Sequence, residues 1–315
     1  MKSSFAMAIV LSRRTAHDDR FQIRRRTMTG RIDDAISMIG DEDRAWQALL
    51  QARSHDWSRG PFHYRDCRGG LTLEEDGRYR AQPALDPAAS TLIDALAPLV
   101  LPNGPQVVAQ LGQSLDGRIA TESGASHYIN GLVGRVHLHR LRALVDAVLV
   151  GAGTVADDDP ALTVRHVEGP QPLRIALDPR ARLSPQRRLF QCEEAPTLHL
   201  IGESARPLSG LGNHVETRRL SVQAGAVSPW DVIETSRERG CRRILIEGGS
   251  ATLSRFLETN ALDRLHILVA PLVIGSGRPG ISLPPIDTLD QARRPPCRHF
   301  SLGEEVLFDL DLRQP

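Results

Sequence analysis

The strongest constraint on the fold is a regular alternation of short apolar runs and helical patterns that starts near Pro105. The runs read QVVAQL, DAVLV, LRIALD, TLHLI, RRILIE and RLHILVA, and the stretches between them include GRVHLHRLRALV, PWDVIETSRERG and SATLSRFLETNAL. Such alternation is typical of a largely parallel sheet with helices on both faces. The last run, EVLFDLDL, alternates apolar and polar residues and predicts an antiparallel edge strand. We therefore expect an α/β fold that binds its ligand beyond the carboxyl ends of the parallel strands.

The chain before Pro105 has a different pattern. DEDRAWQALLQAR has helical spacing with acids in its first turn, LTLEEDGRYRAQ predicts a hairpin around Asp76-Gly77, and PNGP marks a boundary. We expect a disordered leader over residues 1–30 and a small α+β extension of unknown role over residues 31–102. The α/β domain is then expected over residues 103–315.

Composition narrows the classes of partner. Of the 315 residues, 41% are hydrophobic and 24% charged, and the formal net charge of +1 gives no overall field for nucleic acid or anionic membrane. The four cysteines are scattered without a Cys-x-x-Cys pair, which favours reduced thiols in a cytoplasm. No apolar run approaches the ~18 residues that a membrane helix needs. We expect a cytoplasmic protein with no nucleic-acid or membrane partner.

The stretch AVLVGAGTVADDDPALTVR resembles a dinucleotide-binding fingerprint at first sight. It places Gly-x-Gly-x-x-Ala after an apolar run, and Asp178 ends the next run, where a Rossmann unit carries an acidic ribose ligand. However, Pro160 follows six residues after Thr154, and proline inside a helix costs about 3 kcal/mol. Only one or two helical turns can form, so we expect no standard Rossmann unit and expect Asp178 to point away from the cofactor.

The same stretch contains three consecutive aspartates that invite a metal interpretation. Asp157, Asp158 and Asp159 must point in different directions, and a calcium cage needs alternating ligands and a glycine turn that are absent here. Acids beside a helix start account for the pattern. We expect no metal, while one of the aspartates remains a candidate ligand contact.

A second junction, Glu247-Gly248-Gly249-Ser250, lies between an apolar run and an amphipathic helix pattern. Two glycines allow the backbone close to a ligand, and the free amides and dipole of a helix start favour phosphate. The alternative is a glycine turn needed only for tight helix–sheet packing. Glu247, at the end of its strand, is expected to face the cleft.

A third feature is QLGQSLDGRIATESGASHYI, which is rich in small and polar residues and whose only positive charge is Arg118. Arg118 could pair with an anion or donate to a carbonyl, although a plain surface loop is also consistent with the pattern. Arg142 and Arg165 could add basic charge to the cleft. Each alone is explained as a solvated charge.

Taken in order, SLDGRIA, GxGTVxxDDPxLTVR, RIALD, IEGG and APLVIG resemble the reductase domain of the riboflavin-biosynthesis deaminase/reductase, the RibD C-terminal family. The resemblance runs from about Pro105 to the end of the chain. It implies a dihydrofolate-reductase-like fold, a homodimer, and NADPH as cofactor. It also implies hydride transfer to ribose C1′, which reduces the ribosylamino group of a phosphorylated pyrimidine.

The resemblance also implies roles for individual residues. Arg118 and Glu247 would lie at the reacting centre as catalytic residues. The family usually carries tryptophan where this chain has Tyr128. The implied cofactor contacts are Gly112, Tyr128, Thr154, Asp158, Gly249, Ser250, Ala251, Thr252, Leu253, Ser254 and Arg255. The implied substrate contacts are Ser126, Arg142, Leu162, Arg165 and Glu247.

The residues agree with cofactor-based chemistry. Hydride transfer requires the protein to align two reactants and to move a proton, for which Glu247 or a water held by Arg118 is the candidate. No nucleophile elbow or catalytic cysteine motif occurs in the sequence. Two alternatives stay open: a reductase of another pyrimidine or pterin in a related pathway, and a non-catalytic nucleotide-binding module.

Two further expectations concern the choice of cofactor and the deaminase activity that accompanies the reductase in the bifunctional protein. Four arginines after Asp178 could receive the 2′-phosphate of NADPH, or they could form a solvated basic loop. His-x-Glu occurs at His166-Val167-Glu168 and at His214-Val215-Glu216, both within the α/β region after Pro105, and Pro296-Cys297 has no second cysteine three residues on, so we expect no deaminase activity. The four arginines are Arg180, Arg182, Arg187 and Arg188.

Overall fold

The computed structural model describes residues 40–127 and 129–313. This part of the chain divides into two compact units, of which the first ends at Asp94 and the second begins at Ala95. The predicted leader over residues 1–30, the first residues of the predicted extension and Tyr128 lie outside the described residues. The boundary predicted between residues 102 and 103 falls inside the second unit.

The first unit contains an antiparallel sheet of order β1-β2-β3 and a helix that the sequence predicted. Its elements are α2 (Asp41–Ala52), η1 (Trp57–Arg59), β1 (Phe62–Asp66), β2 (Gly69–Leu73), β3 (Tyr79–Gln82) and α3 (Pro87–Leu96), which crosses the boundary between the units. Strands β2 and β3 form the predicted hairpin. Strand β1 was not predicted, because only Phe62 of its residues is buried and the run lacks an apolar pattern.

A buried arginine holds this first unit together. Arg44 of α2 is 0% exposed and donates to the carbonyls of Gly70, Gln82 and Pro83, at distances of 2.7, 3.0 and 3.2 Å. These carbonyls lie at the start of β2 and at and beyond the end of β3, so one guanidinium satisfies backbone groups of both strands. These hydrogen bonds are partly buried, and they give the carbonyls a donor within the protein.

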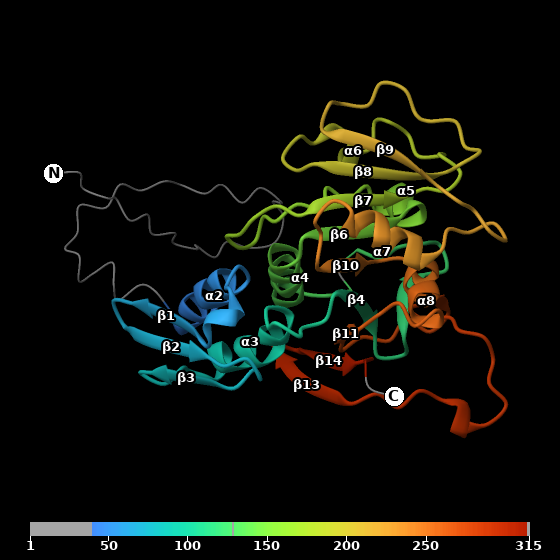
Figure 1. The fold of residues 1–315 in the computed structure, drawn as a ribbon. Helices are drawn as coiled ribbons and strands as arrows, with labels where there is room; N and C mark the ends of the chain where they lie inside the picture. The colour runs from blue at the N-terminus through green and yellow to red at the C-terminus, as the bar shows by residue number, and fades with distance from the viewer. Residues whose placement is uncertain (1–39, 128, 314–315) are drawn as a thin grey trace, which may run out of the picture. The chain divides into compact units, whose positions relative to one another are not determined.

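The second unit is built on a sheet of order β13-β14-β11-β4-β10-β6-β7-β8-β9 (Figure 1). Its strands are β4 (Val107–Ser114), β6 (Ala147–Gly151), β7 (Leu173–Leu177), β8 (Thr197–Gly202), β9 (Val215–Leu220), β10 (Ile244–Glu247), β11 (Arg264–Ala270), β13 (Cys297–Leu302) and β14 (Glu305–Asp311). The six predicted buried runs form β4, β6, β7, β8, β10 and β11, which pair in parallel. The predicted mostly parallel sheet is therefore confirmed.

Helices and short elements complete the second unit. They are η2 (Ala97–Leu99), β5 (Arg118–Thr121), α4 (Leu132–Leu144), α5 (Ala152–Asp158), α6 (Arg188–Gln191), α7 (Pro229–Arg237), α8 (Ser250–Glu258), β12 (Gly277–Pro279) and η3 (Leu289–Gln291). Strands β5 and β12 form a separate two-stranded sheet. Helix α5 has seven residues and ends at Asp159 in the left-handed conformation, directly before Pro160. The short helix predicted from Pro160 is therefore confirmed.

Helices cover both faces of the central strands. Ile244 and Ile246 of β10 pack in one core cluster with Val232 of α7 and Phe256 of α8. Because side chains alternate along a strand, Glu247 faces the opposite side, where α4 lies. Figure 1 shows α4 on one side of β10 and α7 and α8 on the other. This alternation turns the last residue of β10 toward helix α4.

Both edges of the sheet carry polar strands that the sequence did not reveal. Strand β14, the predicted antiparallel strand, pairs with β11 on one side and with β13 on the other, so β13 and not β14 forms the edge. At the far edge β9 pairs in parallel with β8. Both missed strands, CRHFSL and VETRRL, are mainly exposed and carry no apolar run.

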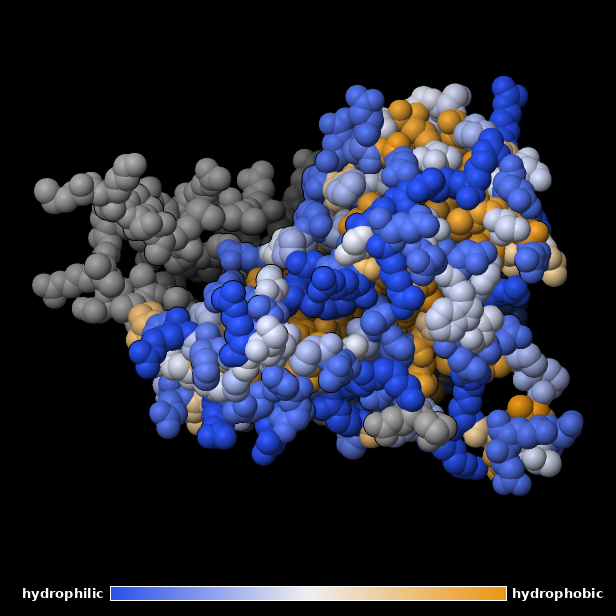
Figure 2. Space-filling view, viewed as in Figure 1, coloured by the Kyte–Doolittle hydropathy of each residue, from blue (hydrophilic) through white to orange (hydrophobic). Residues whose placement is uncertain are grey.

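The face of the molecule in Figure 2 is mainly hydrophilic, with hydrophobic side chains in small groups between the polar ones. None of the helices in the described ranges has both the length and the apolar character needed to cross a membrane.

Candidate active site

The two glycine-containing segments of the sequence, at Gly151 and at Gly248-Gly249, pack against each other at the carboxyl ends of β6 and β10. A Cβ atom added to Gly249 would lie 2.7 Å from Oγ1 of Thr154, and one added to Gly151 would lie 2.3 Å from Oγ1 of Thr252. Each glycine thus leaves room for a threonine of the other junction. Gly248 and Gly249 also have φ values of +60° and +65°, which favour glycine. Gly249 is therefore needed both for packing and for backbone conformation, and Gly151 for packing.

The start of helix α8 is open. Gly249 is the N-cap residue and provides no side-chain hydrogen bond to the helix. The amides of residues 250–252 have no acceptor within the helix, because the first turn of any helix lacks one. Ser250 and Thr252 are half-buried and Ala251 is exposed. Amides and a helix dipole at an accessible end fit a phosphate group.

The remainder of the predicted cofactor segment behaves differently. Leu253 is 0% exposed in the core, and its N–H donates to the carbonyl of Gly249. The hydroxyl of Ser254 accepts a hydrogen bond from the N–H of Ser282. Arg255 is exposed and belongs to the last turn of α8. The side chains of Leu253 and Ser254 are thus committed to the fold.

A buried ion pair joins two predicted substrate residues. Nε and Nη2 of Arg142 donate to Oε1 and Oε2 of Glu247 at 2.7 and 2.6 Å, and Nη1 donates to the carbonyl of Thr163 at 3.1 Å. Arg142 is 6% exposed and Glu247 is 5% exposed. Arg142 is therefore not a solvated charge, and Glu247 turns toward this arginine. In this arrangement their polar atoms are engaged with each other.

Arg165 is held next to this pair by a histidine. Its backbone N–H donates to Nδ1 of His139 at 3.0 Å, and its Nη1 donates to the hydroxyl of Thr163 at 3.1 Å. Burial lowers the pKa of His139 to about 2, and the positive charges of Arg142 and other basic neighbours add to the effect. His139 is thus neutral and accepts. The sequence analysis missed it, although His139 and Arg142 share a helix face at spacing i, i+3.

Leu162 lies in the turn that follows Pro160. It is buried and has a φ of +56°, which is uncommon for a residue with a bulky side chain. Its side chain lies in the interior of the protein, so a substrate could meet only its backbone. Strained backbone of this kind is often found at binding sites.

The three aspartates point to three different partners, as the sequence predicted. Asp157 pairs with Arg278 at 2.7 Å, Asp158 accepts from the hydroxyl of Ser126 at 3.0 Å, and Asp159 accepts from the backbone N–H of Arg188 at 2.9 Å. The contact between Asp158 and Ser126 joins a predicted cofactor residue to a predicted substrate residue. Over residues 40–127 and 129–313, no cluster of three His, Cys, Asp or Glu side chains could hold a metal ion.

Arg118 is tied to a neighbouring loop. Its Nε donates to the carbonyl of Gly275 at 3.0 Å. Asp116 accepts from the N–H groups of Ile274 and Gly275 in the same loop. Hydrogen bonds from the Ser114 hydroxyl and from these amides lower the pKa of Asp116 to about 2. Arg118 thus donates to a backbone carbonyl of the protein, and its role toward a ligand stays a prediction.

Gly112 leaves room for a side chain of the protein itself. A Cβ there would lie 1.7 Å from Oδ1 of Asn130, whose Nδ2 donates to Glu305 at 3.0 Å. Asp178 is 1% exposed and accepts from the N–H of Leu183 at 2.9 Å. Asp178 therefore points into the interior, as predicted, and no Rossmann unit forms around it.

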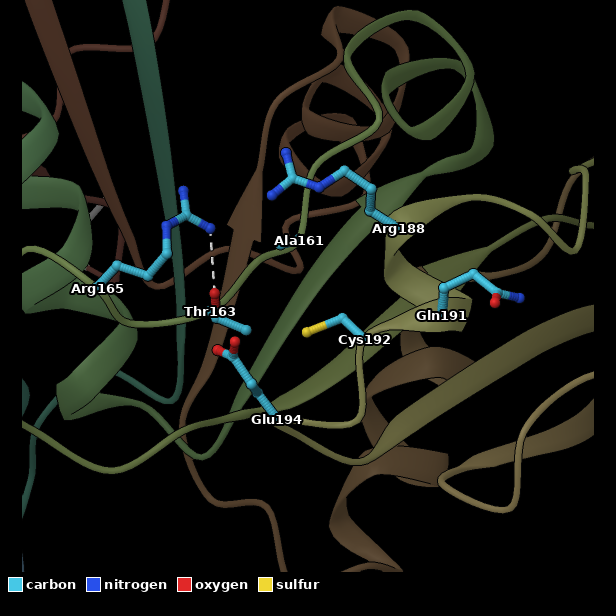
Figure 3. A pocket seen from close by; sticks show the side chains of 7 residues that line it. All are labelled: Ala161, Thr163, Arg165, Arg188, Gln191, Cys192 and Glu194. Atoms are coloured by element: carbon cyan, nitrogen blue, oxygen red, sulfur yellow. Dashed lines mark hydrogen bonds between the residues drawn. The ribbon is translucent and has the colours of Figure 1, made fainter. Parts of the chain in front are cut away.

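A pocket of about 240 Å³ opens beside Arg165. Figure 3 shows side chains from the segment after Pro160 on one side and from the segment around α6 on the other. The residues that line it are Ala161, Thr163, Arg165, Arg188, Gln191, Cys192 and Glu194.

Comparison with known proteins gives the family. The family model of the RibD C-terminal domain matches residues 105–307. The chain is 31% identical over 223 residues to the 2,5-diamino-6-ribosylamino-4(3H)-pyrimidinone 5′-phosphate reductase of Methanothermobacter thermautotrophicus, covering 66% of this chain and 99% of that protein. It is 34% identical to the riboflavin biosynthesis protein RibD of Aquifex aeolicus over 55% of this chain. The matched region covers only 48% of the length of that relative.

Solved structures give the same fold. The diaminohydroxyphosphoribosylaminopyrimidine deaminase/5-amino-6-(5-phosphoribosylamino)uracil reductase of Thermotoga maritima is 27% identical with a TM-score of 0.56, over 71% of this chain and 61% of that one. The riboflavin biosynthesis reductase Rib7 of Saccharomyces cerevisiae, 22% identical with a TM-score of 0.53 over 66% of this chain and 89% of its own, shares the fold. Because the family model matches most of the second unit, the chain belongs to the RibD C-terminal domain family.

Proposed function

We propose that the chain is an NADPH-dependent reductase that converts the ribosylamino group of a phosphorylated pyrimidine into a ribitylamino group, as in riboflavin biosynthesis. The segment Glu247-Gly248-Gly249-Ser250 carries the proposal. Its first residue forms a buried pair with Arg142, and its last residue begins helix α8 at an uncapped end. One short segment therefore links the residues implied for the substrate to the amides implied for a phosphate of the cofactor.

The names of the relatives support the substrate class. The Methanothermobacter protein, which this chain covers almost completely, is named as a reductase of a phosphorylated ribosylaminopyrimidinone. The substrate that we propose is 5-amino-6-(5-phosphoribosylamino)uracil or a close relative. Arg165, beside the buried pair, is the residue that we assign to its phosphate.

The described residues fit a nicotinamide dinucleotide. The left-handed backbone of Gly248 and Gly249 presents no Cβ, and the amides of residues 250–252 have no helical acceptor. Thr154 lies against both glycines and Asp158 lies at the other end of α5. When bound, NADPH would supply the hydride for ribose C1′. The protein would hold the two reactants in line and exclude water.

Glu247 is our candidate for moving the proton that accompanies reduction. Both of its carboxylate oxygens accept hydrogen bonds from Arg142. Its first role in this arrangement is to orient Arg142, which in turn holds the carbonyl of Thr163. Arg118 is the alternative, through a water that it would hold.

The test is oxidation of NADPH by the purified chain in the presence of 5-amino-6-(5-phosphoribosylamino)uracil. We expect turnover with this substrate, and a much lower catalytic efficiency with NADH. Binding of NADPH without oxidation would favour a nucleotide-binding module or another substrate. Equal efficiency with both cofactors would contradict the NADPH assignment, and full turnover by Glu247→Gln would remove the proton role of Glu247.

A homodimer and a cytoplasmic location belong to the same proposal. Analytical ultracentrifugation of the purified chain tests the first, and fractionation of cells tests the second.

A further inference from the structure

The pocket beside Arg165 has two basic walls. One wall is the segment after Pro160, which carries Arg165, and the other is the segment that begins with α6, which carries Arg188. In Figure 3 both guanidinium groups point into the space between the walls, and the carboxylate of Glu194 and the thiol of Cys192 lie across from them. Two cations from separate segments thus face a single volume of about 240 Å³.

The described part of the protein balances the basic charge of this pocket only partly, through the carboxylate of Glu194 on the same pocket. Within residues 40–127 and 129–313 the structure shows no ion pair for either Arg165 or Arg188, and the guanidinium of Arg165 donates to the hydroxyl of Thr163. The backbone N–H of Arg188 donates to Asp159, which fixes the start of α6. Burial lowers the pKa of Arg165, and the positive charges of Arg142 and Arg188 lower it further, while the carboxylate of Glu194 acts in the opposite direction. An anion between the two arginines would relieve this repulsion.

A third arginine donates hydrogen bonds to residues that line the pocket. Arg174 of β7 is 0% exposed, and it donates to the carbonyl of Ala161 on one wall and to the carbonyls of Cys192 and Ala195 on the other, at 3.2, 2.6 and 2.5 Å. Its Nε is buried without a partner. Arg174 therefore ties the two walls together, and the three groups that accept its hydrogen bonds are neutral carbonyls.

The pocket adjoins the candidate reacting centre. The carbonyl of Thr163 accepts from Arg142, and the hydroxyl of the same residue accepts from Arg165. One residue thus connects the pocket to the Arg142–Glu247 pair. Leu162 and Arg165, which are implied substrate contacts, lie in the segment after Pro160 that forms one wall of the pocket. The open start of α8, in contrast, carries implied cofactor contacts. This position favours a substrate group over a cofactor group.

We propose that this pocket binds the phosphate monoester of the substrate between Arg165 and Arg188. Arg188 is the new assignment: it supplies the second cation, and a dianionic phosphate can accept hydrogen bonds from both guanidinium groups at once. Glu194, on the same pocket, is placed to accept hydrogen bonds from sugar hydroxyls. The identity of the phosphate rests on the proposed function. The 2′-phosphate of NADPH has the same chemistry, and the test separates the two.

The test compares Arg188→Gln with Arg187→Gln in the full chain by isothermal titration calorimetry. Arg187 precedes Arg188 but does not line the pocket, so it controls for the loss of one charge. The probes are ribose 5-phosphate, ribose and adenosine 2′-monophosphate. We expect Arg188→Gln to weaken ribose 5-phosphate binding roughly tenfold or more, because a charged hydrogen bond is lost. Arg187→Gln should change it less than about twofold.

Three results would overturn the proposal. They are unchanged affinity for ribose 5-phosphate in Arg188→Gln, wild-type affinity for ribose 5-phosphate no better than for ribose, and a loss confined to adenosine 2′-monophosphate. The last would move the pocket to the cofactor. None of these measurements uses NADPH oxidation. A chain that binds ribose 5-phosphate through Arg188 but oxidises no NADPH would contradict the proposed function and support the phosphate pocket.

Discussion

Arg142 and Glu247, 105 residues apart in the sequence, form a two-point hydrogen-bonded ion pair in the interior of the second unit. Helix α4 carries the arginine in its last turn, and strand β10 carries the glutamate at its carboxyl end. Removing two charges from water is costly, and their attraction offsets this cost only with good geometry. The pair therefore serves mainly to fix the position of the groups around it, including the carbonyl of Thr163.

Breaking this pair from one side should be strongly destabilising. We expect Arg142→Met to lower the free energy of unfolding by about 3–5 kcal/mol, because Glu247 would be left as an uncompensated buried charge. The double variant Arg142→Met/Glu247→Met should recover most of that loss, since neither charge remains. Urea denaturation of the three proteins measures both effects. A double variant as unstable as Arg142→Met would contradict this account of the pair.

Gly249 should tolerate alanine far less than Gly153 does. Gly249 has a φ of +65° and its added Cβ would lie 2.7 Å from Thr154, whereas Gly153 lies in helix α5 with open space around it. We expect Gly249→Ala to cost about 1–2 kcal/mol from backbone conformation alone and to weaken NADPH binding. Gly153→Ala should be neutral or stabilise the protein by up to about 1 kcal/mol.

Thermal denaturation and NADPH titration by fluorescence check this pair of glycine variants. Equal NADPH affinity in Gly249→Ala and Gly153→Ala would show that the turn at Gly249 is not part of the cofactor site.

The parts of the fold that were predictable are those encoded by local patterns. Strands buried on both faces are mainly apolar, so β6 and β10 stand out as AVLVG and ILIE. Pro160 sets the length of α5 by itself, because proline cannot continue a helix. Strands β9 and β13 were missed because mainly exposed edge strands need no apolar run.

The candidate site was predictable in its glycines but not in its arginines. A glycine pair after a strand has few explanations, whereas an arginine in a sequence is most simply read as solvated. Arg142 and Arg174 are buried only because groups from distant parts of the chain converge on them. Which carboxylate or carbonyl meets an arginine depends on the tertiary fold. The pairing of Arg142 with Glu247, and the role of His139, could therefore not be derived from the sequence.

His139 should make stability depend on pH. Its pKa is lowered to about 2 in the folded protein, against an ordinary value of 6.5. Below about pH 6.5 the unfolded chain therefore binds a proton at His139, whereas the folded protein does not. The free energy of unfolding falls as the pH decreases, by at most about 1.4 kcal/mol per pH unit. We expect His139→Asn, which keeps an acceptor for the N–H of Arg165, to remove this dependence.

Urea denaturation between pH 4 and pH 7 measures the slope. His299→Asn is the matched control, because His299 is exposed on β13. Burial also lowers the pKa of His137, but that contribution is present in all the proteins compared and cancels. A slope for His139→Asn equal to that of the wild type would contradict the burial of a neutral His139.

Arg174 should be needed for the pocket to keep its shape. Arg174→Met removes the donor that satisfies the carbonyls of Ala161, Cys192 and Ala195, and each buried carbonyl left without a donor costs about 1–3 kcal/mol. We expect a total loss of about 3 kcal/mol or more in the free energy of unfolding. Hydrogen–deuterium exchange should then increase in residues 161–165 and 188–195, ahead of the central strands. Because Lys keeps the charge but offers fewer fixed donors, Arg174→Lys should lose less stability than Arg174→Met. If exchange rises evenly over the whole unit in Arg174→Met, this arginine stabilises the fold in general and does not hold the two walls of the pocket in particular.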